Sequence, residues 1–310
     1  MLLALGALLF AGGYLLGHRP RPQAADDAAA KEPAGPSPAS RQVPPKPPAA
    51  GRTRQEPPPV PSERYPEDEV IERVEPPPGP MPPGSGVRLA LVIDDLGRSL
   101  EDIDDLEALN VPVTYAVLPF ESKTREVVTR IRQRGHELIC HLPMEPQSGA
   151  NPGPGALLES MTRAELWQAT ETALAAVPGA IGVNNHMGSS LTADAASMRT
   201  VLGVVAEHDL FFLDSRTSAE SVGYRQAVSL GIPAAERQVF LDSDPTVAGI
   251  REQFHRWLAV ARQRGAAIAI GHPHPTTLEV LAEEVPRARE AGYEFVPLSY
   301  LLDYAGDLQP

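Results

Sequence analysis

The sequence predicts an α/β protein built on a parallel β-sheet. Apolar runs rich in β-branched residues alternate about seven times with amphipathic stretches. Runs such as "LALVI" (89–93) and "AAIAI" (266–270) are apolar throughout, which is typical of strands covered on both faces. This alternation indicates parallel strands joined by crossover helices. The arrangement is either an open doubly wound sheet or a barrel.

Each element follows from its own pattern. Strands are predicted over 87–93, 113–118, 137–141, 180–184, 210–213, 238–241, 267–270 and 294–297. Helices are predicted over 100–109, 123–134, 162–176, 193–208, 219–230, 247–264 and 277–291. The motif "TRAE" from Thr162 predicts a capping box, and Gly135 and Gly265 close their helices. The first strand is not followed by G-x-G-x-x-G, and no Walker loop is present, so a nucleotide site is not expected.

Composition divides the 310-residue chain into three parts. Of the 34 prolines, 20 lie between Pro20 and Pro83, and segment 19–86 is too poor in apolar residues to offset the entropy of ordering. We therefore predict a Pro-rich disordered linker over 19–86 and one globular domain over 87–310. A domain of that length can bury a core of its own.

The amino terminus is an uncharged apolar run that predicts export. Segment 1–18 is short for a membrane span and long for a signal-peptide core. It is interpreted as a signal peptide or membrane anchor, although no basic region precedes it. We expect the protein to be exported to the periplasm and anchored to the inner membrane. The single cysteine, Cys140, forbids an intrachain disulfide.

The predicted domain is acidic. Residues 87–310 carry 18 Lys and Arg against 30 Asp and Glu, a net charge of −12. Such a domain repels polyanions, so nucleic acid is a poor candidate ligand. A neutral or amine-bearing polymer remains compatible with this charge.

Polar side chains gather where the predicted strands end. They are Asp94, Asp95, His141, Asn184, Asn185, His186, Asp214, Asp242, His272 and His274. In parallel α/β folds these ends share one face, where sites are built. Carboxylates and imidazoles gathered there suit a divalent cation such as zinc. Taken singly, an Asp in such a place is often a helix cap and a His a structural residue, but their recurrence on consecutive strands favours a site.

Five segments in order resemble the divergent polysaccharide deacetylase family, distant relatives of the NodB-type carbohydrate esterases. They are "LALVIDDLG", "GHELICHLPMEP", "GVNNHMGSSLT", "FFLDSRTS" and "AIAIGHPHPTTLEVL". The resemblance covers residues 87–305. It implies a distorted (β/α) barrel of about seven parallel strands in an exported bacterial protein.

The resemblance also implies roles for the metal site. Asp94 matches the catalytic base, Asp95 a metal ligand and His141 a first ligand histidine. Glu145 stands where the family motif has a second histidine, so either Glu145 is a ligand or His186 supplies the imidazole. We favour His186, which restores an Asp-His-His set.

The last motif implies a general acid. His272 lies at the matching position and His274 is the nearby alternative, while Asn185 and Asp214 are further candidate site residues. The implied activity is a metal-dependent hydrolase, with zinc as the expected cofactor, that removes N-acetyl groups from a cell-envelope polysaccharide such as peptidoglycan. The departure at Glu145 leaves an alternative, a catalytically inactive glycan-binding or scaffold protein on the same barrel. A metal-dependent amidase acting on a non-sugar substrate is a third reading.

Overall fold

A computed structural model describes residues 86–302. The predicted apolar segment 1–18 and the predicted linker up to residue 85 lie outside the described residues, as do residues 303–310. The three-part division of the chain therefore stays a prediction. Within residues 86–302, no helix combines the length and the apolar character that a membrane crossing requires.

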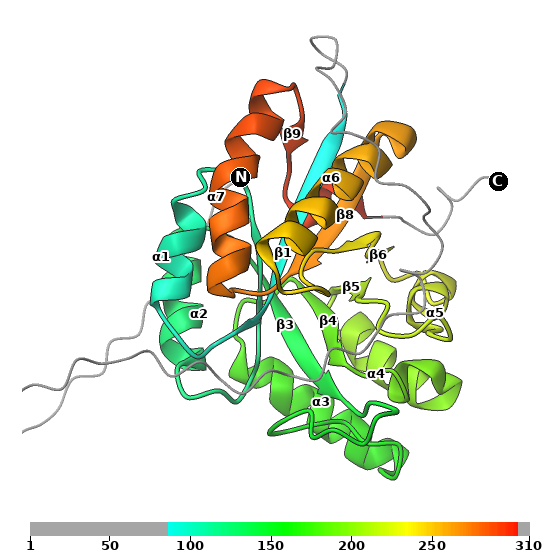
Figure 1. Ribbon diagram of the computed structural model, residues 1–310. Coiled ribbons are helices and arrows are strands. Elements are labelled where there is room, and N and C mark those ends of the chain that lie inside the picture. Colours follow the sequence, from blue (N-terminus) through cyan, green and yellow to red (C-terminus); the bar gives the residue numbers. More distant parts are fainter. Residues whose placement is uncertain (1–85, 303–310) are drawn as a thin grey trace, which may run out of the picture. The chain divides into compact units, whose positions relative to one another are not determined.

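The sheet is a single path of parallel strands (Figure 1). The strands are β1 (Arg88–Leu96), β2 (Thr114–Val117), β3 (Glu137–Met144), β4 (Gly182–Met187), β5 (Phe211–Asp214), β6 (Ala234–Glu236), β7 (Val239–Phe240), β8 (Ala266–Gly271) and β9 (Glu294–Phe295). Their order is β6-β5-β4-β3-β2-β1-β8-β7, and β9 pairs with the start of β1. The predicted parallel α/β fold is confirmed. Strand β6 was not predicted, because three residues after Pro233 are too short to show a period.

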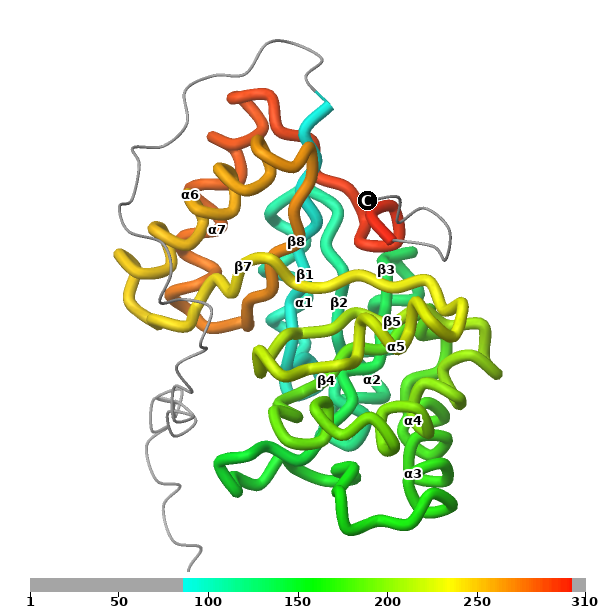
Figure 2. Tube along the Cα trace, turned by 90° about the vertical axis from the view of Figure 1, so that its right-hand side faces the viewer, coloured from blue at the N-terminus to red at the C-terminus, as the bar shows by residue number. Residues whose placement is uncertain are grey.

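Helices pack around the outside of the sheet. They are α1 (Glu101–Glu107), α2 (Thr124–Gln133), α3 (Arg163–Ala176), α4 (Ala195–Glu207), α5 (Gly223–Ser229), α6 (Val247–Arg264) and α7 (Pro275–Glu290). In Figure 2, α6 and α7 lie together on one side of the sheet and α3 and α4 lie on another. The capping box is present, since the Thr162 hydroxyl accepts from Glu165 N and the Glu165 side chain accepts from Thr162 N. Gly265 ends α6 in the left-handed conformation at φ +83°.

Alternation along each strand separates two apolar cores. On β1, Leu89, Leu91 and Ile93 join the large core between sheet and helices. Ala90 and Val92 belong to a second core, which also takes Ala116, Ile139, Phe211, Leu213, Ala235, Phe240, Ile268, Ile270 and Leu298. Since these side chains come from strands along the whole path, they fill the inside of a curved sheet.

The curved sheet closes into a distorted barrel without a ladder between its two end strands. β6 pairs with β5 and β7 pairs with β8, yet only Arg237 and Gln238 separate β6 from β7 along the chain. The two edges must therefore lie close together. The side chain of Gln238 bridges them: its Nε2 donates to Glu236 O at 2.6 Å, and its Oε1 accepts from Ile268 N at 2.7 Å.

Candidate active site

A bulge in β1 explains why two adjacent carboxylates reach the same site. Ile93 pairs with Tyr115 and Leu96 pairs with Val117. The chain therefore advances three residues on β1 over the stretch in which it advances two on β2, so β1 carries one extra residue. Asp95 adopts φ +59°, a left-handed conformation that side chains other than glycine rarely take. Neighbours in a regular strand point to opposite faces, whereas a bulge re-aims one of them. Both carboxylates consequently reach the carboxyl end of the barrel interior.

Three ligand-type atoms converge beside this bulge. Asp95 Oδ1 lies 2.9 Å from His186 Nδ1 and 3.2 Å from His141 Nε2. The two imidazole nitrogens lie 3.2 Å from each other. His141 comes from β3 and His186 from β4, so three strands contribute one atom each. The predicted ligand set of Asp95, His141 and His186 is thus brought together, and its role in binding metal stays a prediction.

The chemistry of this triangle fits a divalent cation. Asp95 Oδ1 is buried and accepts no hydrogen bond of good geometry, which is costly for a carboxylate oxygen. Ligands in a tetrahedral zinc site are about 2.0–2.1 Å from the ion and so about 3.3 Å apart, close to the three separations found here. Two imidazoles and one carboxylate are also a ligand set that zinc commonly takes.

Asn184 contacts one member of this triangle, His141, and also Asp94 beside it. Its Oδ1 lies 2.8 Å from His141 Nδ1, and its Nδ2 donates to Asp94 Oδ1 at 2.9 Å. Because an amide oxygen can only accept, His141 Nδ1 carries the hydrogen. In neutral His141 the lone pair is then on Nε2, which faces the triangle.

The two carboxyl groups of the bulge are held in different electrostatic states. Burial raises the pKa of Asp94, and the opposing charges of His141 and His272 do not cancel that effect. Burial also disfavours the Asp95 carboxylate, but the charge of His186 and the contacts of both imidazoles outweigh it and hold the pKa of Asp95 well below its usual range. Asp95 is therefore the more acidic of the two carboxyl groups and Asp94 the more basic. Such a divergence is what a ligand and a base require.

His272 approaches the same site from β8. Its Nδ1 donates to Asp242 Oδ1 at 3.0 Å, and its backbone N donates to Asp242 Oδ2 at 2.7 Å. Its Nε2 lies 4.0 Å from Asp95 Oδ2. Burial opposes the charged imidazole, but the charge and hydrogen bond of Asp242 prevail and raise the pKa of His272 to about 10.

Asp242, His272 and His274 form a second group close enough to hold a metal ion. Thr277 Oγ1 donates to Asp242 Oδ2 at 2.8 Å, so that carboxylate already has three hydrogen-bond donors. We therefore interpret Asp242 as the residue that orients His272. His274 is exposed, and its ring centroid lies 5.5 Å from that of His272.

The remaining candidates lie outside the Asp–His cluster. Glu145 Oε2 accepts from Glu159 N at 2.7 Å and orders the loop after β3. Asn185 faces the other side of β4, where its Nδ2 donates to Met187 O and its Oδ1 accepts from Ser215 N. Asp214 Oδ2 accepts from Ser221 Oγ and Tyr224 N, which ties down the segment before α5. These contacts give all three residues hydrogen-bond partners outside the cluster, and their candidate roles in the site stay predictions.

The sequence places Asn184 and Asp242 at strand ends but assigns neither a role. For Asn184, strand alternation is the signal that could have assigned one, because it tells inward-facing residues from outward-facing ones. Ile139 and His141 share one face of β3, and by the same parity Asn184 and His186 face inward while Asn185 faces outward. On β5 the inward residues are Phe211 and Leu213, so Asp214 points outward.

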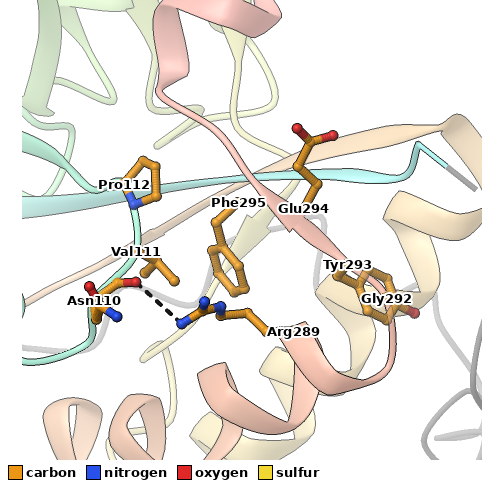
Figure 3. A pocket seen from close by; sticks show the side chains of 8 residues that line it. All are labelled: Asn110, Val111, Pro112, Arg289, Gly292, Tyr293, Glu294 and Phe295. Atoms are coloured by element: carbon orange, nitrogen blue, oxygen red, sulfur yellow. Dashed lines mark hydrogen bonds between the residues drawn. The ribbon is translucent and has the colours of Figure 1, made fainter. Parts of the chain in front are cut away.

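A surface hollow of about 430 Å³ lies at the other end of the barrel (Figure 3). It is lined by the segment before β2, with Asn110 and Val111, by Arg289 in the last turn of α7 and by Phe295 in β9. Arg289 Nη1 donates to Asn110 O at 3.4 Å. Because these residues lie at or before the amino ends of β2 and β9, the hollow is remote from the cluster.

Fold and site together define an α/β-barrel protein with a carboxylate–imidazole cluster, suited to a divalent cation, at the carboxyl ends of its strands. The family model of the divergent polysaccharide deacetylases matches residues 91–302, and the chain belongs to this family. The predicted resemblance to this family and the predicted parallel α/β fold are both confirmed.

Relatives of this chain occur in bacteria. It is 38% identical over 198 residues to the uncharacterized protein YibQ of Escherichia coli strain K12, a match that covers 64% of this chain and 62% of YibQ. The chain thus spans less than two thirds of the length of YibQ. It is 37% identical over 194 residues to an uncharacterized protein of Haemophilus influenzae strain Rd, covering 63% and 69% of the two chains. An uncharacterized protein from Agrobacterium tumefaciens C58 has a crystal structure with a TM-score of 0.65 and 26% identity, covering 72% of this chain and 92% of that one.

Proposed function

We propose that the protein is a metal-dependent hydrolase that removes N-acetyl groups from a cell-envelope polysaccharide such as peptidoglycan. Membership of the divergent polysaccharide deacetylase family supports the reaction class. The observation that carries the proposal is the convergence of Asp95 Oδ1, His141 Nε2 and His186 Nδ1 within 3.2 Å of one another.

In this proposal Asp95, His141 and His186 hold the cation. When bound, a divalent ion, expected to be zinc, supplies the Lewis acidity that activates water and polarises an acyl carbonyl. Asp94 takes the proton from the attacking water, a role that its raised pKa favours. Asp94 Oδ2 lies 3.6 Å from His141 Nε2, so the base adjoins the ligand triangle.

His272 is the proposed general acid. Its pKa of about 10 keeps the imidazole protonated at neutral pH, and its Nε2 faces Asp95 across the site. The proton on Nε2 can therefore pass to the departing amine as the amide bond breaks. Asp242 holds the ring through Nδ1, so that Nε2 points into the site.

The proposed substrate class and the proposed location both rest on the sequence. The net charge of −12 over residues 87–310 disfavours nucleic acid and is compatible with a neutral or amine-bearing glycan. We propose that segment 1–18 directs the chain to the periplasm and anchors it to the inner membrane. An enzyme held there meets envelope glycans first.

The test uses the full chain, purified with and without a chelator step. We expect one equivalent of zinc or a similar ion per chain and release of acetate from peptidoglycan or chito-oligomers. Chelation should abolish the release, and added Zn²⁺ or Co²⁺ should restore it. A chain that takes up no stoichiometric metal contradicts the mechanism. Stoichiometric metal without acetate release contradicts the substrate, and profiling with non-sugar amides then tests the amidase alternative.

A further inference from the structure

We propose that Asn184 is a positioning residue that couples the proposed base to the metal ligand set. The inference rests on the proposed function, which it deepens by giving a role to a residue that the proposed mechanism leaves out. A single amide contacts a ligand histidine with its oxygen and the base with its nitrogen. The proposal rests on these two hydrogen bonds of one side chain.

The first contact fixes which nitrogen of His141 is available. Asn184 Oδ1 lies 2.8 Å from Nδ1 of the ring and can only accept, so the Nδ1–H tautomer is selected. Nε2 is then the nitrogen that faces Asp95 and His186. A ligand histidine is commonly held in this way by an acceptor on its other nitrogen, and loss of that acceptor weakens metal binding.

The second contact fixes the rotamer of Asp94. Asn184 Nδ2 donates to Asp94 Oδ1 at 2.9 Å, which leaves Oδ2 as the oxygen on the side of His141 Nε2. The orientation of the amide is determined, because exchanging its nitrogen and oxygen would place an acceptor against a carboxylate. The hydrogen bond to His141 and the hydrogen bond to Asp94 therefore require the same orientation of the amide.

The amide is itself held rigidly. Asn184 is fully buried, and its Nδ2 also donates to Ser215 Oγ at 3.2 Å. Ser215 is fixed in turn, since its backbone oxygen accepts from Arg237 Nε at 2.7 Å and its backbone N donates to Asn185 Oδ1 at 2.9 Å. Asn184 thus has a firm support on the side away from the reacting groups.

Two substitutions separate the two contacts. Asn184→Ala removes both, whereas Asn184→Asp keeps an acceptor for His141 Nδ1 and replaces the donor that faces Asp94 with a carboxylate oxygen. Two buried carboxyl groups at that distance cannot both stay ionised, so the pair takes up a proton and Asp94 becomes a poorer base. The aspartate variant is isosteric, so it tests the inference even where the alanine variant folds poorly.

The matched control is Asn185→Ala. Asn185 is the adjacent buried asparagine on β4, and it also makes three hydrogen bonds, but on the other face. Its loss should lower thermal stability, and because Asn185 reaches Asn184 only indirectly, through the backbone N of Ser215, it should affect the cation site far less than the loss of Asn184. A general effect of removing a buried asparagine from β4 would appear in both variants.

The experiment measures Co²⁺ affinity and the visible Co²⁺ spectrum of each full-length variant, followed by kcat and KM for acetate release. We expect Asn184→Ala to weaken Co²⁺ binding by about 10- to 100-fold, the usual effect of losing such a partner. Asn184→Asp should bind Co²⁺ with the wild-type spectrum but lose kcat with little change in KM. Asn185→Ala should weaken Co²⁺ binding much less than Asn184→Ala, because it removes no contact with His141 or Asp94.

The outcomes separate this inference from the proposed function. Wild-type Co²⁺ binding without acetate release contradicts the proposed activity, and the comparison of Asn184→Ala with Asn185→Ala then decides the inference on affinity alone. Co²⁺ affinity and spectrum unchanged in Asn184→Ala would overturn it. Equal losses of affinity in the two alanine variants would also overturn it, because the role would then be structural. A wild-type chain that binds no Co²⁺ overturns both.

Discussion

Asp94 and Asp95 show how a local backbone irregularity can give two identical side chains different chemistry. Without the bulge, one carboxylate would face the helices and the other the barrel interior. With it, both are buried near the same imidazoles, and their different contacts move their pKa values apart. The left-handed Asp95 is strained, which is common where a site constrains the backbone.

At the residue scale, the ligand set can be tested against the Glu145 alternative. Asp95→Asn removes the charged ligand and should weaken Co²⁺ binding at least about 10-fold, because a neutral amide is a poorer ligand for the cation. Glu145→Gln should leave the affinity unchanged, since Glu145 binds the backbone of the loop instead. Equilibrium dialysis or calorimetry with Co²⁺ measures both. The prediction is wrong if Glu145→Gln weakens binding as much as Asp95→Asn.

A second prediction at this scale concerns the Asp242–His272 pair and pH. Its pKa of about 10 means that folded His272 keeps its proton at a pH where the unfolded residue has lost it. The resulting stability is fully present below the ordinary histidine pKa of about 6.5 and is lost as the pH rises through about 10. In chelator-treated protein, the stability advantage over Asp242→Asn should therefore shrink from pH 7 to pH 10. Urea unfolding at several pH values measures it, and an advantage that grows with pH would contradict the pairing.

At the element scale, most of the fold followed from the sequence because its signals are local. The range 247–264 and its closing glycine were predicted as found.

The ends of the strands that form the site were placed too early. The predictions stopped at 93, 141 and 184, whereas β1, β3 and β4 run to Leu96, Met144 and Met187. Polar residues there resemble loop residues in sequence, but their hydrogen bonds across strands extend the sheet. Which of two adjacent asparagines faces inward follows from parity, whereas the bulge depends on long-range pairing that no local pattern carries.

The capping box of α3 provides a prediction at this scale. Thr162→Ala removes the hydroxyl that accepts from Glu165 N and should lower the free energy of unfolding by about 1 kcal/mol. Thr162→Ser keeps that acceptor and should remain near the wild type. Chemical denaturation of the full chain measures both variants. Equal losses in the two would show that the methyl group of Thr162, rather than its hydroxyl, stabilises the helix end.

At the scale of the whole domain, the site depends on a barrel that its backbone ladder does not close. Asp242 and His272 follow β7 and β8, while Asn184 and His186 lie on β4, near the opposite end of the strand order. These side chains can face one another only because the sheet curves until β6 and β7 lie close together. The connection through Arg237 and Gln238 is therefore part of what assembles the cluster.

Substitution of Gln238 should weaken the contact between the two edges of the sheet. Gln238→Ala leaves Ile268 N without the acceptor found at 2.7 Å, and an unsatisfied backbone donor of this kind costs about 1–3 kcal/mol when buried. Gln238→Glu keeps that acceptor but loses the donor to Glu236 O, so it should be the milder change. Urea unfolding gives the free energies, and hydrogen exchange at the Ile268 amide reports the local opening. Because loosening separates the end of β8, which precedes His272, from β4, which carries His186, the proposed function predicts that Co²⁺-loaded Gln238→Ala releases acetate more slowly than Gln238→Glu. An alanine variant with wild-type stability and wild-type exchange at Ile268 would mean that the backbone alone holds the two edges together.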